Sequence, residues 1–63
     1  MRHWYKPSER LPKNGEKVIV EEVRHPYLRD AVYVDNGTDK YFLVNNNPCL
    51  PDSIREWAYF DET

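Results

Sequence analysis

The sequence predicts one small, mainly β domain, an antiparallel meander of three or four strands with its N-terminal arm packed on the sheet. Three observations support this fold: apolar runs rich in β-branched residues, turn-forming Asn, Gly and Pro between them, and an N-terminal segment too interrupted for a helix. The chain has 63 residues without repeats or linkers, so we treat residues 1–63 as a single domain. A small α+β arrangement and a barrel-like closure of the sheet both remain open.

The N-terminal arm comes first in the chain. Pro7 and Pro12 interrupt it, and proline is tolerated only at the start of a helix. We therefore expect residues 8–12 to form a turn or one helical turn, with Trp4 packing the arm against the sheet.

Two strands are predicted over residues 17–23 and 29–34, where Val, Ile and Tyr are frequent. An Asn36-Gly37 pair follows the second of them. Asn-Gly between apolar runs is a strong hairpin signal, because both residues tolerate the positive φ that a two-residue type I′ turn requires. We predict a type I′ hairpin there.

The second half of the chain is expected to add a strand over residues 39–44 and a closing strand over residues 54–60. The polar run between them predicts a loop over residues 45–51. Strict alternation in the closing strand would place Ile54 and Trp57 on opposite faces of the sheet.

Both faces of the predicted sheet are apolar. Alternate positions of every strand carry Val, Ile, Leu, Ala or aromatic residues, whereas a solvated antiparallel sheet shows polar residues on one face. Three arrangements satisfy this pattern. The terminal segments cover one face while something else covers the other, the sheet curls toward a barrel, or the second face associates with another copy. The sequence leaves a homodimer and a monomer equally favoured.

Composition excludes several classes of protein. The single cysteine, Cys49, cannot form an intramolecular disulfide, which suits a reducing cytoplasm. No apolar stretch is long enough for a signal sequence or a membrane span. We therefore expect a cytoplasmic protein that does not contact membranes.

A set of spaced residues resembles a known family. The set comprises Trp4, Arg10-Leu11-Pro12, Gly15-Glu16, Val18-Ile19-Val20, Ala31, Tyr33, Ile54 and Trp57. It resembles, over about residues 4–58, the small bacterial and phage family known as domain of unknown function 551. The resemblance implies a small β-rich unit in a phage, prophage or mobile-element context, and it implies no activity or catalytic residue. The chain departs from the family at its end, where Trp57 is followed by Ala-Tyr-Phe rather than Met-Pro-Leu-Pro.

The sequence contains no catalytic signature. Cys49 and His25 are the one nucleophile and base pairing to consider, and we interpret them as a small buried thiol and a loop histidine. The His and Cys spacing does not suit a zinc site, and two glycines cannot build a phosphate-binding loop. We predict a protein that is not an enzyme and has neither a cofactor nor a metal site.

Basic residues gather in the N-terminal segment near aromatic residues, as in small β domains that bind single-stranded nucleic acid. The candidate nucleic-acid contacts are Lys6, Arg10, Lys13 and Lys17. A net charge of −2 argues against this interpretation, because a protein that neutralises several phosphates is usually basic overall. Nucleic-acid binding is therefore the alternative hypothesis.

The favoured hypothesis is a non-catalytic protein-interaction or accessory module of phage or prophage type. Its partner is another protein or a second copy, and tyrosine suits such an interface because it offers area and a hydrogen-bonding tip. The candidate interface residues are Tyr27, Tyr33, Tyr41 and Leu43. The predicted structural residues are Trp4, Leu11, Pro12, Gly15, Val18, Val20, Ala31, Phe42, Ile54 and Trp57.

Overall fold

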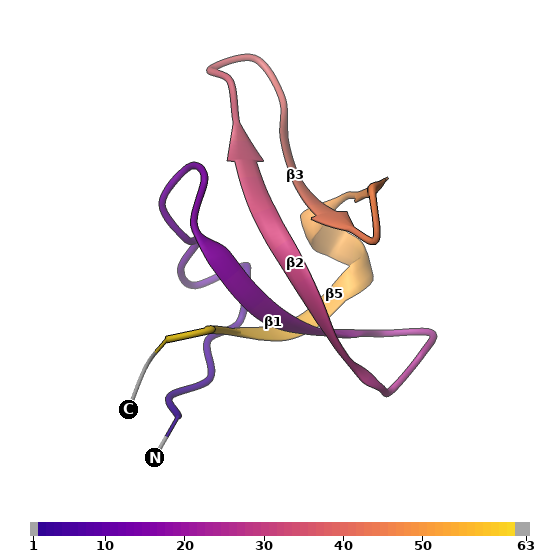
Figure 1. Cartoon of the computed structure of the whole chain (residues 1–63). Coiled ribbons are helices and arrows are strands. Elements are labelled where there is room, and N and C mark those ends of the chain that lie inside the picture. The colour runs from indigo at the N-terminus through magenta and orange to yellow at the C-terminus, as the bar shows by residue number, and fades with distance from the viewer. Residues whose placement is uncertain (1, 62–63) are drawn as a thin grey trace.

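A computed structural model describes residues 2–61, in which five strands form one antiparallel sheet (Figure 1). The strands are β1 (Lys17–Glu22), β2 (Leu28–Asp35), β3 (Lys40–Val44), β4 (Asn47–Cys49) and β5 (Ile54–Tyr59), with a 3-10 helix, η1 (Pro51–Ser53), before β5. The predicted mainly β class is confirmed. Each predicted strand is present with its ends shifted by a residue, and β4 is an additional strand.

The strand order in the sheet is β4-β3-β2-β1-β5. The first four strands form a meander, in which each pairs with its neighbour in sequence, and β5 then pairs with β1 on the opposite side. The predicted antiparallel meander is therefore confirmed. The strand number was underestimated by at least one, and the sheet is not closed into a barrel.

The core lies on one face of the sheet, which we call the inner face. Its buried side chains are Val18, Val20, Ala31, Tyr33, Phe42, Val44, Ile54 and Trp57. Tyr33 and Phe42 lie on paired strands with their ring centroids 5.0 Å apart. Trp57, fully buried, is the largest of the set. The inner face therefore takes one residue in two from β1, β2 and β3, as alternation requires.

The N-terminal arm packs against this core as predicted. Tyr5 and Leu11 contact the buried cluster, and the indole N–H of Trp57 donates a hydrogen bond to the carbonyl of Arg10 at 2.8 Å. The carbonyl of Lys6 accepts hydrogen bonds from the backbone N–H groups of Glu9 and Arg10, which forms a turn that begins two residues before the predicted range 8–12. The arm is thus fixed to the sheet by a partly buried hydrogen bond as well as by apolar packing.

The Asn36-Gly37 hairpin is present, but its predicted turn type is wrong. Asp35 pairs with Lys40, so the loop has four residues, and Gly37 rather than Asn36 has a positive φ. The side-chain oxygen of Asn36 accepts hydrogen bonds from the backbone N–H groups of residues 38 and 39 at 3.0 and 2.7 Å. This side-chain turn competes with the type I′ geometry that the dipeptide favours.

The two-residue turn lies instead between β3 and β4. Asn45 and Asn46 have φ values of 51° and 67°, and Val44 pairs with Asn47 across them. Asn tolerates this left-handed region because its short side chain bonds locally. The predicted loop over residues 45–51 is therefore wrong, since it contains a hairpin turn and the edge strand β4.

The closing strand does not alternate strictly. The β1–β5 register shifts between Glu21 and Glu22, so that Glu22 pairs with Ile54 whereas Glu21 pairs with Glu56. A bulge of this kind inserts an extra residue and turns the side chains beyond it to the other face. Ile54 and Trp57 consequently belong to the same core cluster, contrary to the prediction.

Candidate interaction surfaces

The face of the sheet opposite the core is the first candidate surface, and we call it the outer face. It consists of the residues that alternate with the core positions, namely Lys17, Ile19, Glu21, Leu28, Asp30, Val32, Val34, Tyr41, Leu43, Glu56 and Ala58. The strand register arranges them in rows. Val32 lies between Lys17 and Leu43 on its neighbouring strands, and Val34 lies beside Tyr41. Leu43 in turn lies beside Pro48 of the edge strand.

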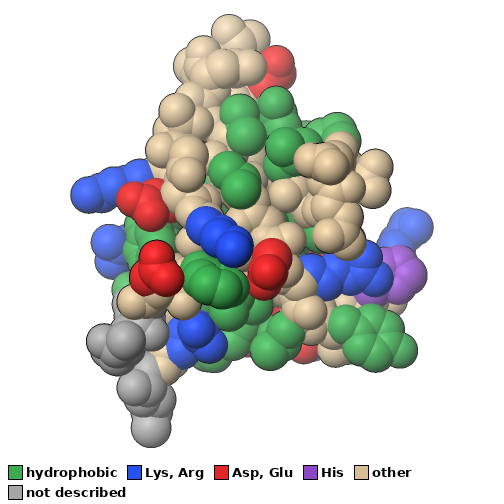
Figure 2. Space-filling model, viewed as in Figure 1, with side chains coloured by type: hydrophobic (Ala, Val, Ile, Leu, Met, Phe, Trp, Pro, Cys, Tyr) green, Lys and Arg blue, Asp and Glu red, His purple; other side chains and the backbone are tan. Residues whose placement is uncertain are grey.

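An apolar band runs across this face from β3 to β1. Val32 at its centre is 38% exposed, and Ile19, Val34, Tyr41 and Leu43 are half-buried. Figure 2 shows hydrophobic side chains gathered over β2 and β3, below the loop at the top of the view. Contiguous apolar surface on a small soluble domain commonly marks an interaction site.

Two opposite charges interrupt the apolar band. Lys17 lies beside Val32, and Asp30 lies beside Ile19, so the two charges occupy one diagonal of a four-residue square on β1 and β2. Both side chains are exposed. The ammonium of Lys17 lies 4.1 Å from the ring centroid of Phe60, which orients it by a cation–π contact. The outer face thus carries one positive and one negative group within its apolar band.

Both edges of the sheet are protected against pairing with another strand. On β5, Tyr5 and Trp57 exchange backbone hydrogen bonds of 2.8 and 2.9 Å, so the arm occupies that edge. On β4, the middle residue is Pro48, which has no N–H to donate. A partner that adds a strand would meet few free groups at either edge. The faces are therefore better candidates for contact.

A basic hollow is the second candidate surface. It has a volume of about 420 Å³ and is lined by Arg10, Lys13, Glu16, Lys17, Tyr59 and Asp61. Three of the four predicted nucleic-acid contacts thus meet at one place. The guanidinium of Arg10 lies 4.8 Å from the ring centroid of Tyr5. Two acidic residues in the same lining offset much of this positive charge.

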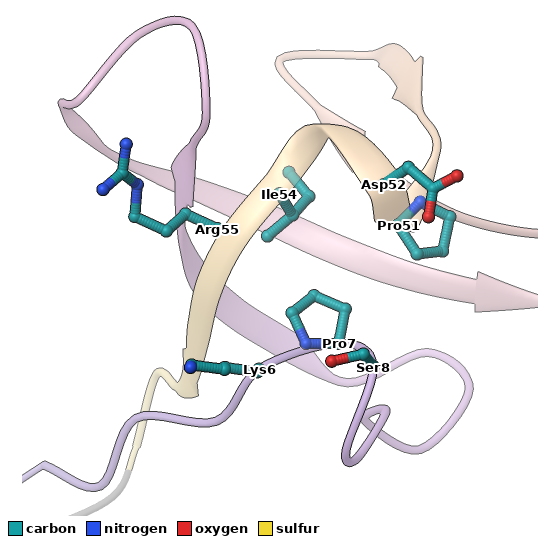
Figure 3. Close-up of a pocket in the computed structure, with 7 residues that line it drawn as sticks. All are labelled: Lys6, Pro7, Ser8, Pro51, Asp52, Ile54 and Arg55. Carbon is teal, nitrogen blue, oxygen red and sulfur yellow. The ribbon is translucent and has the colours of Figure 1, made fainter.

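Lys6, the fourth predicted nucleic-acid contact, lies elsewhere. It lines a separate hollow of about 280 Å³ with Pro7, Ser8, Pro51, Asp52, Ile54 and Arg55. Figure 3 shows Lys6 and Arg55 directed to one side of this hollow and Asp52 to the other, with proline rings and Ile54 between them. The charges do not converge on one point, so the hollow has no evident ligand.

The four predicted interface residues do not form one surface. Tyr41 and Leu43 lie on the outer face, while Tyr27 is 66% exposed in the connection between β1 and β2. Tyr33 is 1% exposed and belongs to the core, so its assignment to an interface is wrong. The physical reason is that successive side chains of a strand point to opposite faces. Val32 and Val34 lie on the outer face, so Tyr33 between them lies on the inner face.

Sequence reasoning omitted some of the residues that complete the outer face. Ile19, Val32 and Val34 were not among the predicted interface residues, although their alternation with the core positions indicates that they lie on the outer face. Lys17 was assigned to nucleic acid rather than to this face, and Asp30 received no assignment. Pairing register, which sequence does not give, is what brings these residues together.

Most of the predicted structural residues are buried in the structure. Pro12, Val18, Val20, Ala31, Phe42, Ile54 and Trp57 are buried, and Trp4 and Leu11 are half-buried. Gly15 is exposed and has a φ of +84°, a conformation that other residues rarely adopt. Its N–H donates a hydrogen bond to the carbonyl of Tyr33 at 2.7 Å, so this turn is anchored on β2.

Cys49 lines a third hollow, of about 480 Å³, between β4, η1 and the end of β1. Its thiol lies 3.8 Å from a carboxylate oxygen of Glu22, and Arg29 forms an ion pair with the same carboxylate at 3.6 Å. Burial and then the negative charge of Glu22 raise the pKa of the Cys49 thiol above its ordinary value. The thiol is therefore kept protonated at neutral pH, which lowers its nucleophilicity.

Two further observations concern residues 2–61. No three His, Cys, Asp or Glu side chains in this range come together in a way that could hold a metal ion. None of its helices combines the length and the apolar character needed to cross a membrane.

Compared with known proteins, the chain matches no family model, no curated protein and no solved structure. The resemblance to domain of unknown function 551 therefore stays an expectation based on the spacing of residues 4–58.

Proposed function

We propose that this chain is a non-catalytic protein-interaction module, of the accessory kind found in phages and prophages, that docks through its outer face in the cytoplasm. The observation that carries the proposal is the apolar band centred on Val32, which stays open to solvent while both sheet edges are protected. The phage context comes from the resemblance of the sequence, and the cytoplasmic location from its single cysteine.

The chemistry of the face supports a protein partner over a small ligand. The band is lined by branched aliphatic side chains and Tyr41, which bury area at low cost in side-chain entropy. It lies on a sheet face, whereas small-molecule sites are concave and enclose most of their ligand. A flat apolar surface with a few charges is the usual anatomy of a protein interface.

Photo-crosslinking in bacterial cells tests this proposal. A benzophenone amino acid replaces Val32 in one variant, and in a matched control it replaces Thr38, which is exposed on the β2–β3 loop. We expect covalent protein adducts from position 32 and few from position 38. An absence of adducts from position 32 in folded protein would overturn the proposal, whichever protein the partner is.

A second candidate function is binding of single-stranded nucleic acid in the basic hollow. The specific observation in its favour is that Arg10, Lys13 and Lys17 line one hollow together with Tyr59. Cations that track a backbone and an aromatic ring that stacks a base are the elements of such sites. Glu16 and Asp61 line the same hollow, and their negative charges argue against nucleic-acid binding there.

Fluorescence anisotropy with a labelled single-stranded oligonucleotide tests the second candidate. If it holds, binding weakens with salt and is lost when Arg10 and Lys13 are both changed to Glu. The matched control changes Arg24 and Lys40 to Glu, which alters the net charge equally at exposed positions outside the hollow. Equal loss in both double variants would indicate nonspecific attraction and exclude the hollow as a site.

A further inference from the structure

We infer that the partner of the outer face is a second copy of this chain, related by a two-fold axis that runs along the diagonal through Tyr41, Val32 and Ile19. This inference rests on the proposed function and identifies the partner. It follows from the strand register, which fixes where each outer-face residue lies relative to the others.

The three residues lie on one straight line. Side chains that pair across the strands form rows on the outer face. Val32 lies one strand and one row away from Tyr41, and Ile19 lies one strand and one row further in the same direction. A two-fold axis in the plane of the interface acts on positions in that plane as a reflection. Residues on the line therefore meet their own copies, so three apolar side chains pack against themselves.

The charges fit the same symmetry. Lys17 and Asp30 lie on the other diagonal of the square that contains Val32 and Ile19. With strands about 4.8 Å apart and alternate residues about 6.8 Å apart, the reflection brings Lys17 of one copy opposite Asp30 of the other, with an offset of roughly 3 Å within the interface plane. Each dimer would thus hold two ion pairs between copies, and no ion pair between Lys17 and Asp30 forms within the described chain.

The two other residues of the apolar band, Leu43 and Val34, are matched in the same way. The reflection brings Leu43 of one copy opposite Val34 of the other, again with an offset of roughly 3 Å within the interface plane. The apolar band of one copy therefore faces the apolar band of the other. One set of residues on a single face supplies both halves of each contact, which is what a self-complementary interface requires.

The crossing angle of the two sheets follows from the direction of the axis. The diagonal makes about 35° with the strands, so strands of the two copies cross at about 70°, nearer to the orthogonal class of sheet packing than to the aligned class. Twisted sheets crossing at this angle touch best along a line. Beyond Ile19 the same line reaches Glu56, where the two carboxylates approach each other and oppose association.

The size of the molecule limits the strength of the dimer. Its two longest extents are 33 and 24 Å. A face of those dimensions would measure roughly 800 Å², so the outer face offers at most the area that each partner of a standard interface buries. Because the apolar band covers only part of a face, we expect a dissociation constant on the order of 10 to 100 micromolar.

Analytical ultracentrifugation from low micromolar to submillimolar protein tests the inference. The wild-type chain should shift from monomer to dimer. Lys17→Glu and Asp30→Lys each create two like-charge contacts per dimer and should each weaken dimerisation at least about tenfold. An equimolar mixture of the two variants should form a heterodimer again. In that heterodimer the introduced glutamate faces the introduced lysine, and the unchanged Asp30 of one copy faces the unchanged Lys17 of the other.

Glu56→Gln is a second, independent variant. It removes the like-charge contact on the axis and should tighten the dimer, whereas a dimer formed elsewhere would not respond. Circular dichroism of each variant checks that the surface changes leave the fold intact. A wild-type chain that stays monomeric throughout, or variants whose mixture fails to associate, would overturn the inference. Crosslinking of position 32 to a different protein would still support the proposed function.

Discussion

At the scale of single residues, the hydroxyl of Tyr33 stands out within the described chain. It is buried and has no hydrogen-bond partner in the structure, and burial together with the nearby Asp35 charge raises its pKa. A buried polar group without a partner costs stability, whereas its apolar isostere does not. The ring itself packs on Phe42 and is needed for the core.

Tyr33→Phe should therefore leave stability unchanged or increase it by about 1 kcal/mol, because only the unpartnered hydroxyl is removed. Urea unfolding followed by Trp fluorescence measures the change. Tyr41→Phe on the half-buried outer face serves as the matched control and should have little effect. A loss of stability in Tyr33→Phe larger than in the control would mean that the hydroxyl has a partner such as a bound water.

Cys49 gives a second prediction at this scale. Because burial and Glu22 raise the thiol pKa, alkylation by iodoacetamide should be slower than for an unfolded cysteine at mildly alkaline pH, and its rate should rise only at higher pH. Glu22→Gln removes the charge contribution and should speed the reaction at a given pH. The urea-denatured chain provides the reference rate. A folded chain that reacts as fast as the denatured one would contradict this prediction.

At the scale of elements, four of the five strands could be predicted from sequence, whereas the turn types could not. Runs of β-branched residues located the ends of β1, β2, β3 and β5 to within one residue, because side-chain shape favours the pleated conformation locally. The type of each turn depends instead on the competition between side-chain and backbone hydrogen bonds. The Asn36 side chain accepts hydrogen bonds from the backbone of its own loop. The left-handed turn predicted at Asn36-Gly37 is formed instead by Asn45 and Asn46.

The left-handed turn between β3 and β4 can be tested directly. Asn46→Gly should be neutral or slightly stabilising because glycine accepts positive φ, whereas Asn46→Ala should cost about 1 kcal/mol. Thermal or urea unfolding measures both variants. Thr38→Ala, in a loop of the same sheet but with a side chain that makes no contact described above, is the control. Equal effects of Gly and Ala at position 46 would show that the turn does not need this conformation.

At the scale of the whole molecule, the described residues cover one face of the sheet and leave the other exposed. Sequence parity indicated two apolar faces, and it correctly separated Val18 and Val20 from Ile19. It could not show which face the arm covers, because that depends on the return of β5 to β1 and on the contact between Trp57 and Arg10. The candidate surface therefore emerged only from register and topology.

The arm's role as an edge cover gives a prediction for the intact molecule. Tyr5→Pro removes the N–H that bonds the Trp57 carbonyl, and should destabilise the domain by about 1 to 3 kcal/mol and expose the edge of β5. Light scattering at elevated protein concentration should then show aggregation. Tyr5→Phe keeps the backbone and the ring, and should behave like the wild type. A soluble, equally stable Tyr5→Pro variant would show that the arm is dispensable.

The pairing of β5 with β1 also determines when the domain can fold during synthesis. Val20 meets Trp57 across that pair, so the contacts that complete the core span most of the described chain and their loop closure comes late. The four-strand meander alone lacks Trp57 and Ile54, which complete the buried cluster. A ribosome-bound chain truncated before β5 should therefore remain protease-sensitive, and protection should appear only once Tyr59 has emerged. We thus expect the domain to fold after translation of β5 rather than progressively from its N-terminus.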